Sequence, residues 1–131
     1  MKKRFFVMLV VLVLASFCFS ITAYAASSYT STLAFQGEHT GPTREYTGTD
    51  MRWRGTTYTR GQAAIMSNYF DVSLYRKNII GSSYIGTVTC NRTGSHNLSW
   101  SNVGSGKYYF YYVKARDGAD VVSDAITMSM S

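Results

Sequence analysis

Residues 98–114 read Leu98-Ser-Trp100-Ser-Asn-Val103-Gly-Ser-Gly106-Lys-Tyr108-Tyr-Phe110-Tyr-Tyr112-Val-Lys114. Apolar residues occupy alternate positions in the first part, a Gly-Ser-Gly corner follows, and the second part is almost entirely aromatic. Because successive side chains of a β-strand point to opposite faces, this pattern predicts two strands joined across a bend. The stretch therefore decides the fold class, and it indicates structure rather than chemistry.

The rest of the chain shows the same alternation of short strands and turns, and no window has a sustained helical period. Further strands are predicted over residues 26–35, 44–59 (one or two strands, with Trp53 in the core), 70–75, 79–90 and 121–130. Together these segments predict an all-β fold, an antiparallel β-sandwich of about seven or eight strands. A closed barrel fits the same pattern and is the less favoured alternative.

Turn residues separate the predicted strands. Residues 36–43 contain the one proline of the chain and are expected to be a loop. The residues Arg76-Lys77-Asn78 should form the end of a hairpin, with Ile79 starting the returning strand. Asp117-Gly118 is a strong signal for a second hairpin, between two apolar strands. Residues 63–66 fit a short helical turn or a strand equally well.

The N-terminal residues have the pattern of a secretory signal peptide. Lys2, Lys3 and Arg4 precede the apolar run 5–14, and Ala23-Tyr24-Ala25 is a small-x-small cleavage site. We expect cleavage after Ala25, which leaves residues 26–131 as a single β-sandwich domain that is secreted and extracellular. Retention of the run as a membrane anchor is the less favoured alternative, because it is short for a span and serines and a threonine follow it.

Charge and cysteine content limit the partners. Thirteen Lys and Arg face seven Asp and Glu, but three of the basic residues belong to the predicted signal peptide. The remaining modest surplus favours an anionic partner such as a wall polymer or lipid headgroups, and nucleic acid is not expected for an exported domain. Cys90 would be the one cysteine left, and it is expected to be a small buried hydrophobic residue rather than a reactive thiol.

No pattern in the chain predicts catalysis, a metal site or a cofactor. His39 and His96 have no second histidine nearby, and we expect both to be loop or solvent residues. The carboxylates of Asp117, Asp120 and Asp124 lie near one turn, where aspartate commonly accepts from its own backbone. A loose calcium loop there is a minor alternative, because the spacing of an EF-hand is absent. We therefore expect no enzyme, no cofactor and no metal.

The candidate binding residues come from two aromatic and basic stretches. Tyrosines alternate onto both faces of the predicted strand 106–114, so one pair must point away from the core. Exposed Tyr109 and Tyr111 would suit stacking on sugar rings or contact with a partner, and cross-strand pairing within the sheet is the plainer interpretation. Arg52 and Arg54 alternate with Trp53 and should face solvent, where they could contact an anionic polymer or membrane surface.

The stretch around Gly106-x-Tyr108-x-Phe110 resembles the E-to-F corner of immunoglobulin-like sandwiches. In that family the tyrosine hydroxyl bonds back to the backbone and a cysteine two residues later faces the core. The resemblance implies that Tyr108 is the corner tyrosine and that Tyr108, Phe110 and Tyr112 form the inner face. The opposite register, which buries the intervening residues, remains open.

The same stretch is similar to a strand of bacterial pre-peptidase C-terminal domains and of small secreted β-sandwich proteins of Gram-positive bacteria. The resemblance implies an immunoglobulin-like or jelly-roll-like sandwich and assigns no site. The chain departs from true immunoglobulin domains because both disulfide cysteines are missing.

These observations predict a secreted, non-catalytic binding or interaction module that acts at or outside a bacterial cell surface. Its expected partner is a cell-wall polymer, a carbohydrate or a protein, with a membrane surface as a further partner that the chain does not span after cleavage. The alternatives are a membrane-active or bacteriocin-like secreted protein and, less favoured, a small secreted hydrolase.

Overall fold

A computed structural model describes residues 27–61 and 67–131 of the chain. The predicted signal peptide, its cleavage position and residues 63–66 lie outside the described residues. The described part consists of strands, turns and loops and contains no helix. The strands are β1 (Ser28–Ser31), β2 (Ala34–Phe35), β3 (Glu38–Thr40), β4 (Arg44–Tyr46), β5 (Met51–Arg60), β6 (Tyr69–Lys77), β7 (Ser82–Asn91), β8 (Gly94–Trp100), β9 (Gly106–Val113), β10 (Asp120–Ser123) and β11 (Ile126–Met130).

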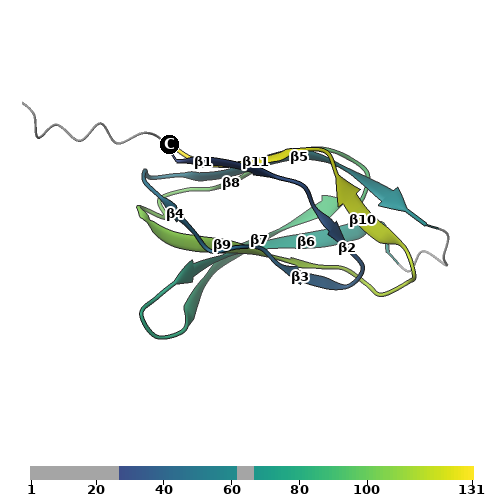
Figure 1. Cartoon of the computed structure of the whole chain (residues 1–131), viewed down its shortest axis with the longest axis horizontal. Helices are drawn as coiled ribbons and strands as arrows, with labels where there is room; N and C mark the ends of the chain where they lie inside the picture. Colours follow the sequence, from purple (N-terminus) through teal and green to yellow (C-terminus); the bar gives the residue numbers. More distant parts are fainter. Residues whose placement is uncertain (1–26, 62–66) are drawn as a thin grey trace, which may run out of the picture.

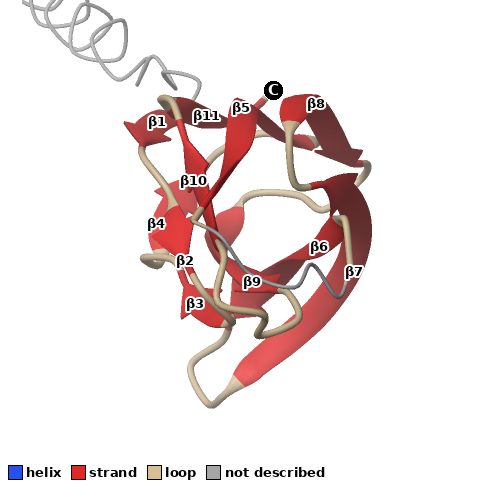
Figure 2. Cartoon of the chain, turned by 90° about the vertical axis from the view of Figure 1, so that its right-hand side faces the viewer, coloured by secondary structure: helices blue, strands red, loops and turns tan. Residues whose placement is uncertain are grey.

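These strands form two antiparallel sheets that face each other (Figure 1). Sheet A has the order β1-β11-β5-β10-β2, and β8 pairs with the other edge of β5. Sheet B has the order β3-β9-β6-β7, and β4 pairs with β9 beyond the end of β3. Figure 2 shows the same two layers from the side, with β1, β11, β5 and β8 in one and β9, β6 and β7 in the other. The predicted all-β antiparallel sandwich is confirmed.

The chain passes from one sheet to the other at almost every long connection. Three pairs of short strands each occupy one position in a sheet, because both members lie along the same neighbouring strand position: β1 and β2, β3 and β4, and β10 and β11. The two sheets therefore have eight strand positions. Among the strands of the described residues, only β6 and β7 are long consecutive strands that pair in the same sheet. This repeated crossing is the arrangement of a jelly roll, whereas an immunoglobulin sandwich contains several hairpins within one sheet.

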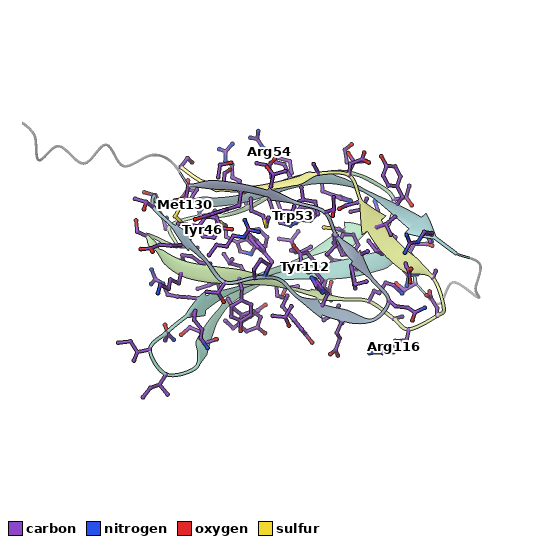
Figure 3. All side chains as sticks on the ribbon, viewed as in Figure 1. Tyr46, Trp53, Arg54, Tyr112, Arg116 and Met130 are labelled. Carbon is purple, nitrogen blue, oxygen red and sulfur yellow. The ribbon has the colours of Figure 1, made fainter. Side chains whose placement is uncertain are left out.

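The core lies between the sheets and is built from inward-facing residues of both. Trp53 on β5 is fully buried, and its indole Nε1 donates a hydrogen bond of 2.9 Å to the hydroxyl of Tyr112 on β9. Figure 3 shows both side chains between the layers. Tyr108 and Phe110 are also buried, so the predicted inner face of the aromatic strand is confirmed. Alternation along β5 and β9 therefore places large aromatic residues in the centre of the sandwich.

The bend between β8 and β9 is the corner that the sequence predicts. The Tyr108 hydroxyl lies 2.6 Å from the carbonyl oxygen of Val103 and 2.7 Å from that of Gly104, so it donates to the backbone of the bend. Gly104 has a φ of 74°, a conformation that a residue with a Cβ adopts only with strain. The hydroxyl closes the bend where the chain leaves sheet A and enters sheet B.

Replacing Tyr108 by phenylalanine is expected to destabilise the fold by about 1–3 kcal/mol, because two backbone carbonyls of the corner lose their donor. The ring itself stays in place, so the loss reports the hydroxyl alone. Urea denaturation followed by tryptophan fluorescence measures it. An unchanged unfolding midpoint would show that the corner does not depend on this hydrogen bond.

Three expectations about connections are wrong. The segment 36–43 is not entirely loop, because β3 lies within it and pairs with β9. Ile79 does not start a strand but lies at the tip of the β6–β7 turn, and β7 begins at Ser82. Asp117-Gly118 forms a turn, with Gly118 at a φ of 81°, but the turn joins sheet B to sheet A. No hairpin forms there because both edges of β9 are already paired, one with β3 and β4 and the other with β6.

Candidate functional site

Four tyrosines gather on the outer face of sheet B, and we call them the tyrosine face: Tyr75, Tyr84, Tyr109 and Tyr111. Tyr75 lies on β6, Tyr84 on β7, and the other two on β9. The strand register places Tyr75 directly opposite Tyr109 on one side and Tyr84 on the other. Because neighbouring strands lie about 4.8 Å apart, these three rings form a row roughly 10 Å long across the sheet.

The rings of the tyrosine face contact one another. Tyr75 and Tyr109 stack with centroids 5.3 Å apart and an interplanar angle of 4°. Tyr84 and Tyr111 meet the Tyr75 ring at 60° and 84°, with centroids 5.5 and 6.3 Å away. Tyr75 is therefore the centre of the cluster, and its neighbours hold the rings in fixed orientations on the exterior of the sheet.

A shallow hollow of about 360 Å³ lies within this cluster, lined by Thr40, Tyr75, Tyr109 and Tyr111. All four lining residues carry hydroxyl groups. Elsewhere on the outer face of sheet B, the Tyr84 hydroxyl lies 2.7 Å from Thr87 Oγ1, which lies 2.7 Å from Ser73 Oγ. Burial and a hydrogen bond to Glu38 raise the pKa of Tyr111, so its hydroxyl stays protonated near neutral pH. The hollow thus combines aromatic surfaces with hydrogen-bonding groups.

The structure does not bring all four candidate binding residues together. Tyr109 and Tyr111 share the tyrosine face, with their side chains pointing away from the core as predicted. Arg52 and Arg54 are exposed on the outer face of sheet A, where Arg54 Nε donates to Asn97 Oδ1 over 3.2 Å. Figure 3 shows Arg54 pointing outward from the opposite layer. The arginines and the tyrosines therefore lie on opposite outer faces of the sandwich, because β5 and β9 belong to different sheets.

The two histidines lie in different sheets, His39 on β3 of sheet B and His96 on β8 of sheet A. His39 is exposed on β3 and stacks against Tyr112, with ring centroids 6.0 Å apart. His96 on β8 is half-buried, with its Nε2 2.9 Å from Thr57 Oγ1, and burial lowers its pKa. The expectation of a loop or solvent position is wrong for His96, because alternation along β8 turns its ring toward the sandwich interior.

The carboxylates near the β9–β10 connection each have a different partner. Asp117 Oδ2 lies 2.6 Å from Arg92 Nη1, and Asp117 Oδ1 lies 3.2 Å from Lys114 Nζ, with all three side chains buried. Asp120 pairs with Arg60 at 2.8 Å, and Asp124 accepts from the Tyr58 hydroxyl at 2.5 Å. Within residues 27–61 and 67–131, no group of three or more metal-ligating side chains is present.

Cys90 on β7 is buried, as the sequence predicts. Burial, with the nearby Asp71 carboxylate as a second cause, raises the pKa of its thiol to about 11. The thiolate is the reactive form of cysteine, so this side chain stays protonated and unreactive at neutral pH.

A second hollow lies between the sheets and is lined by residues that include His39, Phe110, Tyr112 and Met128. Its volume of about 120 Å³ is well below the roughly 300–1,000 Å³ of typical small-molecule sites. The hollow of the tyrosine face falls within that range.

In the described part of the chain, no helix has the length and apolar character needed to cross a bilayer.

Two of the four tyrosines were not predicted as site residues. Tyr75 and Tyr84 flank the predicted hairpin end, but their meeting with Tyr109 depends on the pairing of β6 with both β7 and β9. The alternation of Phe70, Val72 and Leu74 on the inner face was the available signal for Tyr75, because a residue that follows Leu74 by one position points to the opposite face.

No protein-family model and no curated protein matches the chain. Several solved structures resemble it in shape. The Yersinia pseudotuberculosis-derived mitogen is 13% identical, with a TM-score of 0.47 over 82% of this chain and 88% of that one. The infectious bursal disease virus VP2 subviral particle is 12% identical, with a TM-score of 0.49 over 82% of this chain and only 33% of that one. A chain of Bacillus endospore appendages, disulfide-linked pili, is 8% identical, with a TM-score of 0.34 over 82% and 92% of the two chains.

Proposed function

We propose that this protein is a secreted, non-catalytic binding module that binds glycan chains of a bacterial cell surface through the tyrosine face. The observation that carries the proposal is the row formed by Tyr109, Tyr75 and Tyr84 across three neighbouring strands, beside the hollow under Tyr111. Export rests on the pattern of the first 25 residues, with their basic start, apolar run and small-x-small site.

The chemistry of the tyrosine face suits a sugar polymer. A pyranose ring has apolar C–H surfaces that pack on aromatic rings and a rim of hydroxyls that exchange hydrogen bonds. Thr40 and the tyrosine hydroxyls provide donors and acceptors around the hollow, and Glu38 accepts a hydrogen bond from the Tyr111 hydroxyl. Because the row crosses the strands at about 10 Å in length, it can contact successive units of an extended chain.

The proposal is distinct from a purely structural role for the tyrosines. Cross-strand aromatic pairs stabilise a sheet by roughly 0.2–1 kcal/mol each, and such pairs need no exposed surface. Tyr84, however, is 59% exposed, far more than a stabilising contact requires. An exposed, rigid ring beside a hollow is the property that a binding surface needs and that sheet stability does not.

Replacing Tyr84 or Tyr109 by alanine is expected to weaken binding to peptidoglycan by about tenfold, because each change removes one stacking surface from the row. Sedimentation of the protein with purified, insoluble peptidoglycan measures the binding, and teichoic-acid-free sacculi and cellulose distinguish the polymer recognised. Tyr109→Phe should retain most of the affinity, since the ring is kept.

Tyr58→Ala is the matched control, because Tyr58 is a 40% exposed strand tyrosine on the outer face of sheet A. Its binding should equal that of the unmodified protein. If none of these polymers retains the protein, or if Tyr58→Ala weakens retention as much as the two test variants do, the proposal fails. Urea unfolding of each variant separates a lost contact from a lost fold.

A further inference from the structure

The turn between β6 and β7 carries two isoleucines with no contact to the core. Ile79 and Ile80 have relative exposures of 104% and 91%, the highest of the large hydrophobic side chains in the described residues. The hairpin that carries them projects beyond the rest of sheet B (Figure 1). Burial of one isoleucine side chain is worth about 1.5–3 kcal/mol, so two adjacent ones left in water indicate a surface that becomes covered.

The turn is well ordered by its own hydrogen bonds. The backbone N–H of Asn78 donates to the carbonyl of Gly81 over 3.1 Å, and the Asn78 side-chain amide donates to Ser83 Oγ over 2.7 Å. Gly81 has a φ of 73°, which closes the turn without strain. The two isoleucines are therefore presented at the tip by a defined backbone conformation.

Basic residues surround the base of the tip. Residues 75–84 and 101–108 contain Arg76, Lys77 and Lys107 and no acidic residue. Arg76 Nη2 donates to the carbonyl of Ser105 over 2.6 Å, and its guanidinium lies 5.2 Å from the Tyr108 ring centroid. These contacts join the hairpin to the β8–β9 corner, so that Lys77 and Lys107 line one open hollow together with both isoleucines. Glu45, opposite Lys107 on β4, offsets part of this charge.

We propose that the tip of the β6–β7 hairpin inserts into an anionic lipid surface, with Ile79 and Ile80 in the acyl region and Lys77 and Lys107 at the headgroups. The position of the residues fits this placement: β6 ends at Lys77, and the two isoleucines occupy the turn that follows it. Interfacial segments bury their apolar side about 5–10 Å deep. A convex apolar tip ringed by lysines complements a fluid, negatively charged surface. This contact uses the end of sheet B and does not depend on glycan binding by the tyrosine face.

Flotation with lipid vesicles tests the proposal. The protein is collected from the culture medium, its N-terminus is read by mass spectrometry, and it is mixed with vesicles of phosphatidylcholine alone or with added phosphatidylglycerol. We expect flotation with the anionic vesicles that weakens as salt rises. The double variant Ile79→Ser/Ile80→Ser should bind at least about tenfold more weakly. It should retain the unfolding temperature of the unmodified protein, because both side chains are exposed.

A charge-matched pair of variants locates the attraction. Lys77→Gln/Lys107→Gln should lose affinity for anionic vesicles on the order of tenfold. Arg52→Gln/Arg54→Gln removes the same charge from the outer face of sheet A and should lose much less. The proposal would be overturned if the protein floated with neither type of vesicle. Unchanged flotation of the isoleucine variant would also overturn it. Peptidoglycan binding of the isoleucine variant should be unchanged, which separates this contact from the tyrosine face.

Discussion

Alanine in place of Asp117 is expected to lower the free energy of unfolding by about 3–5 kcal/mol. The carboxylate lies between two buried cations, with Arg92 Nη1 at 2.6 Å and Lys114 Nζ at 3.2 Å. Asp117 Oδ1 also accepts from the backbone N–H of Ala119. Removing it leaves two buried positive charges close together without their counter-charge, which costs far more than the loss of an exposed ion pair.

Urea or thermal unfolding measures this effect, and Asp120→Ala is the matched control. Asp120 pairs with Arg60 at 2.8 Å, but the two side chains are 29% and 65% exposed. Water screens such a pair, so its loss should cost less than about 1 kcal/mol. Equal, small losses in both variants would show that the buried network does not hold the β7–β8 and β9–β10 connections together.

Replacing Trp53 by alanine should destabilise the protein by a similar amount, about 3–5 kcal/mol, because the side chain is fully buried and leaves a cavity between the sheets. Trp53→Phe keeps most of the volume and removes the indole N–H that donates to the Tyr112 hydroxyl. We expect that variant to lose about 1–3 kcal/mol, because a buried hydroxyl loses its donor.

Chemical denaturation followed by far-ultraviolet circular dichroism measures both Trp53 variants without relying on tryptophan emission. The Tyr58→Ala variant is the control, because Tyr58 is an exposed residue of the same strand. Its free energy of unfolding should fall by less than about 1 kcal/mol. A Trp53→Ala protein as stable as the Tyr58→Ala protein would place Trp53 outside the core and contradict the alternation along β5.

The sequence predicts side-chain direction well and strand partners poorly. Alternation predicted Trp53 in the core because the two-residue period of a strand is local. For the aromatic strand, alternation left two registers open, and the resemblance to an immunoglobulin-like corner favoured the one that buries Tyr108 and Phe110. The corner tyrosine was also predictable, since its hydrogen bond spans only four or five residues. Asp117-Gly118 suits a hairpin or a crossing between sheets, and the choice depends on distant strands that occupy the edges of β9.

The same limit applies to the candidate site. Alternation predicted that one tyrosine pair of β9 faces outward, and that pair is Tyr109 and Tyr111. It could not indicate that Tyr75 and Tyr84 join them, because the meeting depends on the register of three strands. The exposed arginines of β5 face outward as predicted, but the outward direction of a side chain does not reveal to which sheet its strand belongs. Similarly, an apolar pair after a polar turn suggests a new strand, whereas Ile79 and Ile80 occupy the turn itself.

The proposed function places glycan binding on the outer face of sheet B. Nuclear magnetic resonance titration of the ¹⁵N-labelled protein with soluble peptidoglycan fragments tests it directly, because amide shifts report the contacted strands. We predict shifts concentrated around Tyr75, Tyr84, Tyr109 and Tyr111, with the amides of Arg52 and Arg54 unchanged. Shifts confined to sheet A, or a spectrum unaltered at saturating fragment concentration, would contradict the claim.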